Sequence, residues 1–270
     1  MDKYFRAKRN DLIKRSFRDI ADHDYIAARA CARLELLDQF LWSSLQCLEK
    51  YLKAIILFHD GDTRKIGHNL TEATNRINAL QCNPFEVEPA TMKFFEYLTQ
   101  YGGDRYLMRP RGTLGDELLK LDDAVWSVRR FCEDMTVLKE SNSKQYDGYV
   151  KYLTSPKCTQ SALKFRLYYK DGYLEKVLDT DKHLAQREAL VWKNLRYGSR
   201  KKSRPRQIKQ TMTGVTPTHY LFPELFEWMK DHVELGSAKK IIEEQIKAGQ
   251  HKNCGTIKIK PKKQGSANEF

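Results

Sequence analysis

The chain has 270 residues, of which 41% are hydrophobic and 31% are charged, and its formal net charge is +13. This balance excludes a disordered chain, and the length favours one large domain or two small ones. No stretch reaches the roughly 18 apolar residues of a transmembrane helix, and the charged N-terminus lacks the apolar core of a secretory signal. Six scattered cysteines with no C-x-x-C pair argue against a zinc ribbon and a disulfide framework. These features favour a cytoplasmic protein with reduced thiols and without a membrane segment.

The positive charge is confined to the second half of the chain. Residues 1–140 contain 22 basic and 22 acidic residues, whereas residues 141–270 contain 26 basic and 13 acidic residues. Within this half, one run of 17 residues has eight cations and no acid, which favours a polyanionic partner and predicts nucleic-acid binding. The predicted nucleic-acid-binding residues are Lys193, Arg196, Arg200, Lys201, Lys202, Arg204, Arg206 and Lys209. Trp192 and Tyr197 at the edge of this run suit base stacking.

In chain order, the first half predicts helices joined by short loops. Residues 1–20 resemble a basic amphipathic helix, and Asp22 and Asp24 suit the start of a second helix. Apolar residues at steps of three and four then predict one helix up to about Phe58, or two helices with a break near 35–38. The residues of this apolar face are Leu34, Leu37, Leu41, Leu45, Leu48, Leu52 and Ile55. Further helices are predicted over 69–80, 89–101 and 113–138. Residues 1–142 are therefore expected to form an all-helical bundle.

The second half predicts a smaller basic α+β region over 143–248. Residues 161–169 alternate apolar and polar, Lys170–Gly172 suits a turn, and 173–178 is expected to return as the second strand of a β-hairpin. Helices are predicted at about 181–195, 224–235 and 238–248. The Lys-rich residues 249–270 are expected to form a flexible tail. The expected fold class is mainly α, with a helical bundle followed by this region.

Four local motifs in the first half occur in a recognisable order. They are Ala28-Arg29, the segment Glu49–Ala54 (Glu-Lys-Tyr-Leu-Lys-Ala), Gly67–Leu70 (Gly-His-Asn-Leu) and Asp104–Tyr106 (Asp-Arg-Tyr). In this order and spacing, residues 20–138 resemble the HEPN family, the "higher eukaryotes and prokaryotes nucleotide-binding" domains. The resemblance implies a bundle of four to five helices that usually forms a homodimer.

The resemblance also implies three kinds of function. Family members act as metal-independent ribonucleases in toxin–antitoxin and antiviral defence systems, as partners of small nucleotidyltransferases, or as nucleotide-binding modules. The ribonuclease branch carries an Arg and a His near the last helix, with four to six residues between them. No His lies between His68 and His183, and Arg18 with His23 is the one pair in the chain with that spacing.

Candidate site residues surround the predicted helix at 69–80. His68 is a candidate general base and Arg64 a candidate catalytic partner. Candidate phosphate-binding residues are Lys53, Lys65, Arg105, Arg109 and Arg111. Basic groups before a helix N-terminus attract anions, and three arginines within seven residues can fork phosphates. Each also has an ordinary structural interpretation, in surface ion pairs, turns or helix caps.

No resident cofactor is expected. His59, Asp60 and Asp62 lack a second cluster that would complete a metal site, and the chain has no P-loop, no G-x-G-x-x-G and no G-x-S-x-G. The leading prediction is binding of nucleic acid, preferably RNA, or of a nucleotide phosphate. The alternatives are a metal-independent endoribonuclease and a non-catalytic protein partner of a nucleotidyltransferase.

Overall fold

The structure, a computed structural model, describes most of the first half of the chain and parts of the second. The described residues are 2–80, 85–103, 111–112, 115–135, 140, 146–148, 150–151, 172–194, 196–198, 212–213, 223–233 and 238–247. The chain divides into two compact units. The first comprises Met1–Arg105 and Arg111–Met212, and the second Tyr106–Pro110 and Thr213–Phe270.

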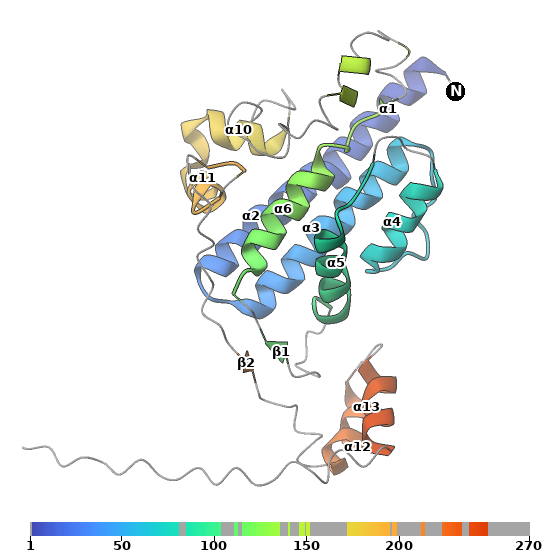
Figure 1. Cartoon of the computed structure of the whole chain (residues 1–270), viewed down its shortest axis with the longest axis vertical. Coiled ribbons are helices and arrows are strands. Elements are labelled where there is room, and N and C mark those ends of the chain that lie inside the picture. The colour runs from blue at the N-terminus through green and yellow to red at the C-terminus, as the bar shows by residue number, and fades with distance from the viewer. Residues whose placement is uncertain are drawn as a thin grey trace, which may run out of the picture. The chain divides into compact units, whose positions relative to one another are not determined.

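The first unit is a bundle of helices (Figure 1). Its bundle helices are α1 (Lys3–Ile13), α2 (Asp19–Arg33), α3 (Leu37–Phe58), α4 (Leu70–Ala79), α5 (Pro89–Tyr101) and α6 (Glu117–Arg129). Later helices of the same unit are α10 (Tyr173–Asp179), the 3-10 turn η2 (Asp181–His183) and α11 (Leu184–Val191). The second unit contains α12 (Pro223–His232) and α13 (Ala238–Lys247). Two strands, β1 (Arg111–Gly112) and β2 (Met212–Thr213), have two residues each.

Helix α3 forms the centre of the bundle, in contact with α2, α4, α5 and α6. Its buried leucines follow the predicted spacing, which confirms that this face points inward. They are Leu41, Leu45, Leu48 and Leu52. Of the two alternatives for this stretch, the break is the one observed: α2 ends at Arg33 and α3 begins at Leu37. Leu34 lies in the turn between them and is 67% exposed, so its place on the apolar face is wrong.

The start of α2 differs from the prediction. The helix runs without a cap from α1 through the π-helical turn η1 (Lys14–Arg18) into α2. Asp22 is not a capping residue, because its carboxylate is buried and bound to Arg129. Helix α6 ends at Arg129, earlier than the predicted end near residue 138. The mainly α fold class is confirmed.

The predicted β-hairpin is not observed. Residues 161–171 lie outside the described part of the chain, and residues 173–178, its predicted second strand, belong to helix α10. Leu174, Val177 and Leu178 are buried at helical spacing, and burial of one such face stabilises a helix. The apolar pattern of these six residues therefore belongs to a short helix that packs on α2.

Two buried arginines of the bundle hold α10 and α11. Arg129 from α6 makes two bonds to Asp22 (2.7 and 2.8 Å) and two to Glu175 of α10 (2.7 and 2.8 Å). Burial alone would lower the pKa of Arg129, but the two carboxylates outweigh it and raise this pKa well above its usual value. Arg29 from α2 pairs with Asp122 and donates to the Ala189 and Trp192 carbonyls at the end of α11. The predicted domain boundary at 142 stays a prediction.

Within the described residues, no helix combines the length and apolar character that a membrane crossing requires.

Candidate functional site

His68 lies beside two residues of the central helix α3. Its Nδ1 atom is 2.6 Å from Oε2 of Glu49, and Lys53 Nζ is 2.5 Å from the other oxygen, Oε1. The Glu49 side chain is 9% exposed, whereas that of His68 is 53% exposed. An ionised carboxylate only accepts hydrogen bonds, so Glu49 fixes the proton of neutral His68 on Nδ1. In this tautomer the Nε2 atom of His68 carries the free lone pair of the ring.

The same face of α3 carries further polar and aromatic side chains. The ring of Trp42 contacts the His68 ring edge-on, with centroids 5.5 Å apart. Lys50 Nζ lies 2.5 Å from Asp24 of α2 and 3.2 Å from Gln46. Positions 42, 46, 49, 50 and 53 recur at helical spacing, which places these side chains on one stripe of α3. Lys50 and Lys53 on this stripe each contact a carboxylate. The contacts of His68 with Glu49 and Trp42 are suited to holding its imidazole in one orientation.

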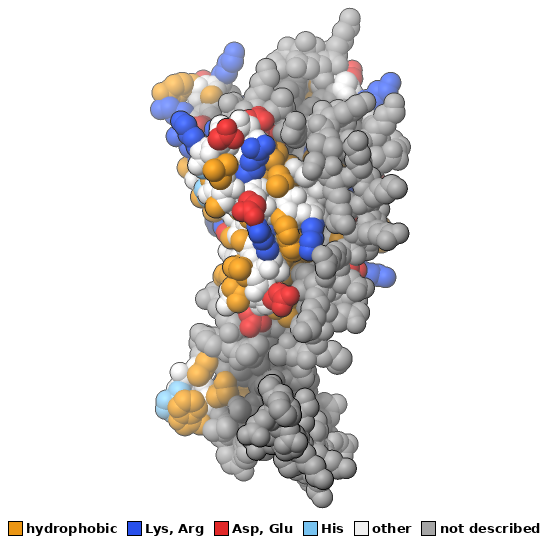
Figure 2. All heavy atoms as spheres, turned by 90° about the vertical axis from the view of Figure 1, so that its left-hand side faces the viewer, with side chains coloured by type: hydrophobic (Ala, Val, Ile, Leu, Met, Phe, Trp, Pro, Cys, Tyr) orange, Lys and Arg blue, Asp and Glu red, His pale blue; other side chains and the backbone are white. Residues whose placement is uncertain are grey.

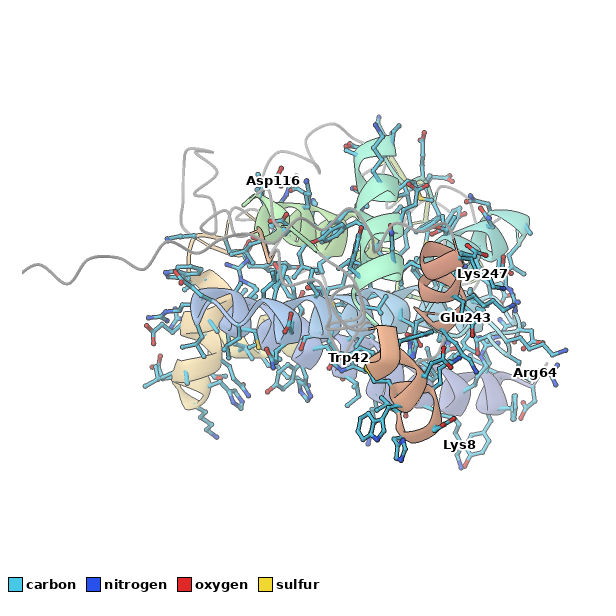
Figure 3. All side chains as sticks on the ribbon, turned by 90° about the horizontal axis from the view of Figure 1, so that it is seen from below. Lys8, Trp42, Arg64, Asp116, Glu243 and Lys247 are labelled. Carbon is cyan, nitrogen blue, oxygen red and sulfur yellow. The ribbon has the colours of Figure 1, made fainter. Side chains whose placement is uncertain are left out.

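Arg64 is not brought to this cluster. Its guanidinium makes bonds of 2.9 to 3.1 Å to Asp62, and its side chain is 86% exposed. Hydrogen bonds from Arg64 lower the pKa of Asp62 to about 2. Figure 3 shows Arg64 well away from Trp42, the residue that contacts His68. Lys65 is exposed on the same loop, in a left-handed conformation (φ 66°).

The N-terminus of α4 already uses part of its hydrogen-bonding capacity. The Asn69 side chain accepts from the Glu72 N–H (2.9 Å), and the Thr99 hydroxyl accepts from the Leu70 N–H (3.2 Å). These bonds satisfy two of the free N–H groups that would otherwise attract an anion. This helix end therefore has fewer free N–H groups for an anion than the sequence predicted.

The other predicted phosphate-binding residues are only partly described. Arg105 and Arg109 lie outside the described residues. Arg111 is the first residue of β1, and only its backbone is described. Their contribution to a site with His68 stays a prediction.

The basic run begins on the surface of the bundle. Lys193 Nζ lies 4.0 Å from the ring centroid of Trp192. Arg196 bonds Asp123 of α6 through Nε (2.9 Å) and lies 2.8 Å from it through Nη2. Tyr197 is 5% exposed, so the prediction that it stacks on a base does not fit its position. The remaining cations of the run, from Arg200 to Lys209, lie outside the described residues.

The single Arg–His pair with ribonuclease spacing is split in the structure. Arg18 is buried and bonds Asp19 at 3.0 Å. His23 lies against Tyr173 of α10, with ring centroids 4.0 Å apart. These contacts give Arg18 a structural role in the bundle.

The sequence predicted no role for Glu49 at the site, although Glu49 belongs to the motif Glu49–Ala54. The available signal was the spacing of Glu49 and Lys53, which share one helix face. Its contact with His68 depends on how the α3–α4 loop folds back. In the part of the chain that is described, no three His, Cys, Asp or Glu side chains gather as ligands for a metal ion.

Comparison with known families agrees with this bundle. The family model of the HEPN domain matches residues 15–133. This segment is a HEPN domain. It runs from the π-helical turn η1 to just beyond α6 and contains Glu49, Lys53 and His68. No curated protein and no solved structure matches the chain at a significant level.

Proposed function

We propose that this chain binds RNA, or the phosphates of a nucleotide, through its HEPN domain together with the basic run that follows α11. One observation carries the proposal. The basic run starts on the HEPN bundle itself. There Arg29 donates a hydrogen bond to the Trp192 carbonyl, and the Lys193 ammonium group lies over the Trp192 ring. The run of eight cations at 193–209 therefore begins at a turn that the bundle holds in place. A polyanion is the partner that such a charge distribution attracts.

A gel-shift experiment with purified full-length protein and end-labelled single-stranded RNA tests this. EDTA is present, and the salt concentration is about 50 or 300 mM. Each phosphate contact releases counterions, so six contacts would weaken binding about a thousandfold over this interval. No shift at low salt would contradict the proposal and direct the search to a protein partner such as a nucleotidyltransferase.

A triple variant locates the binding residues. Arg200, Lys201 and Lys202 are changed to alanine, which should reduce the slope of log affinity against log salt by about two. The matched control removes the same charge from exposed positions outside the basic run, at Lys3, Lys8 and Lys93. Equal losses in the two variants would indicate attraction to net charge and would contradict a defined binding run.

A second candidate function, RNA cleavage, is favoured by the Glu49–His68 pair. A carboxylate that holds Nδ1–H leaves Nε2 as a base. In this reaction, Nε2 accepts the proton of a ribose 2′-hydroxyl. The oxygen attacks the adjacent phosphorus, and the 5′-oxygen of the next nucleotide leaves with a proton from solvent. The products are a 2′,3′-cyclic phosphate and a 5′-hydroxyl.

The same gel reads cleavage. Loss of RNA shortening in His68→Asn, with binding retained, would support the nuclease. His23→Asn is the matched control, and cleavage lost only there would move the site to the N-terminal helices. Intact RNA in the presence of wild-type protein would contradict this second candidate and leave the binding proposal in place. The homodimer stays a prediction that light scattering can test.

A further inference from the structure

The turn after α11 is held by buried polar groups of the bundle. Asn194 is completely buried, and its Nδ2 donates to the Tyr25 hydroxyl and the Leu190 carbonyl, both at 2.9 Å. Its Oδ1 accepts from the N–H groups of Arg196 (2.8 Å) and Tyr197 (3.0 Å). Together with the bonds from Arg29 to the Ala189 and Trp192 carbonyls, these contacts fix the turn at Trp192, Asn194, Arg196 and Tyr197. A surface group on this turn is therefore pre-organised.

The Trp192 ring on this turn has two cations close to it. Trp192 is half-buried, with Lys193 Nζ 4.0 Å and the Arg33 guanidinium carbon 5.9 Å from its ring centroid. Arg33 comes from the end of α2 and pairs with Glu188 of α11 at 2.7 Å. Figure 2 views the side of the molecule on which Figure 1 places α10 and α11, and there basic and hydrophobic side chains adjoin each other.

We infer that Trp192 is a stacking platform for an unpaired base, with Lys193 and Arg33 contacting the phosphates on either side of it. The inference rests on the proposed function and narrows its ligand to single-stranded nucleic acid. Bases in a duplex are stacked on one another, so only an unpaired base offers a face to a side chain. The face of an indole ring that attracts an ammonium group also suits a base. On binding, Lys193 moves from the ring to a phosphate and the base takes its place.

The neighbouring aromatic residues do not compete for this role. Tyr197 and Trp126 are buried, and their rings pack on each other with centroids 5.8 Å apart. Arg196 is bound to Asp123 and lies over Trp126. Among the described residues close to the start of the basic run, Trp192 therefore combines partial exposure with cations at its ring.

The test compares two substitutions of similar burial in the full-length protein. Trp192→Leu fills the core side but lacks a π face, whereas Trp192→Phe keeps one. Affinity is measured for single-stranded oligouridine of about 12 nucleotides and for an RNA duplex of equal length. We expect Trp192→Leu to weaken single-strand binding about tenfold, because a stacked base contributes on that scale. Trp192→Phe should recover most of this loss, and duplex binding should change less than twofold in both.

Three results would overturn the inference. They are an unchanged single-strand affinity in Trp192→Leu, an equal loss for single strand and duplex, and an equal loss in the Phe and Leu variants. If wild-type protein binds the oligomer but Trp192 has no effect, the stacking inference fails and the proposed function stands. If wild-type protein binds neither RNA, both fail.

Tryptophan fluorescence gives a second reading that does not depend on affinity. Stacking of uracil on Trp192 should quench part of the emission of the wild-type protein, and Trp192→Phe should abolish that part. Trp228→Phe, which removes an exposed tryptophan of α12 in the other unit, is the matched control. Quenching that persists in Trp192→Phe would contradict the inference.

Discussion

At the scale of single residues, the bundle relies on charges that are buried and fully bonded. Arg129 has bonds to both oxygens of Asp22 and of Glu175, and all three side chains are at most 3% exposed. A buried charge is costly to desolvate, and its partners share that cost only while the pair is complete. Removal of one member therefore leaves uncompensated charge inside the protein.

We expect Arg129→Met to lower the free energy of unfolding by about 3–5 kcal/mol, because Asp22 and Glu175 then remain buried without their cation. Urea unfolding followed by circular dichroism measures this. Arg64→Met is the control, since Arg64 is 86% exposed and solvent screens its ion pair with Asp62. Similar effects for the two variants would contradict a structural role of the buried pair.

His59 gives the bundle a pH-dependent stability. Burial lowers its pKa, an effect that Arg9 reinforces and that Asp134 and Asp60 partly offset. The unfolded chain, with a His pKa of roughly 6.5, then binds this proton at higher pH than the folded chain does. The stabilisation is thus present above that pH and is lost as the pH falls through 6.5 toward the lowered folded value.

The expected result is a shallower decline of stability between about pH 7 and 5 in His59→Gln than in wild type. Urea midpoints across this interval measure it. His232→Gln, a change at an exposed position of α12, is the matched control for loss of a histidine. A parallel decline in wild type and His59→Gln would refute the assignment.

At the scale of elements, the sequence predicted a helix best where a single apolar face of that helix is buried. Leucine spacing identified the inward face of α3, and Glu35, with a positive φ of 60°, lies at the break before it. The sequence predicted the structure poorly where a residue's contacts come from distant parts of the chain. Asp22 looked like a helix cap but pairs with an arginine 107 positions later. Residues 173–178 looked like a strand because the bundle surface that covers them is not encoded locally.

Helix α10 begins at a point with no space for a side chain. A Cβ atom on Gly172 would lie 2.0 Å from Glu175 Oε2 and 2.8 Å from Arg129 Nη2. Gly172→Ala should therefore displace the buried carboxylate and destabilise the protein by about 1–3 kcal/mol. Gly103→Ala is the matched control, because nothing lies within 4 Å of its Cβ position. Thermal unfolding compares them, and equal melting temperatures would show that the pair can shift without cost.

At the scale of the whole molecule, the sequence anticipated the HEPN domain and the mainly α fold, because several motifs and a long apolar period agreed. The site was harder to foresee. The sequence predicted His68 as a site residue, but its hydrogen bond to Glu49 depends on the fold of the loop between α3 and α4. Arg64, predicted as its partner, bonds Asp62 and not His68. Contacts between side chains far apart in sequence are set by packing, which no local pattern contains.

Among the described residues, those buried in the main core all belong to the first unit. A chain that ends at residue 212 should therefore keep the melting temperature of the full-length bundle within about 2 °C. Circular dichroism at 222 nm provides the measurement. A large drop would indicate that residues 213–270 stabilise the bundle.

The two arginines that reach beyond the bundle also bear on how this domain can be inherited. The segment that matches the family ends at residue 133, yet Arg129 finds Glu175 and Arg29 finds two carbonyls only in residues 172–192. A recombination event that moved the family segment alone would carry two buried cations away from part of their partners. Selection should therefore keep the bundle and its trailing helices together as one heritable module, longer than the sequence signature that identifies it.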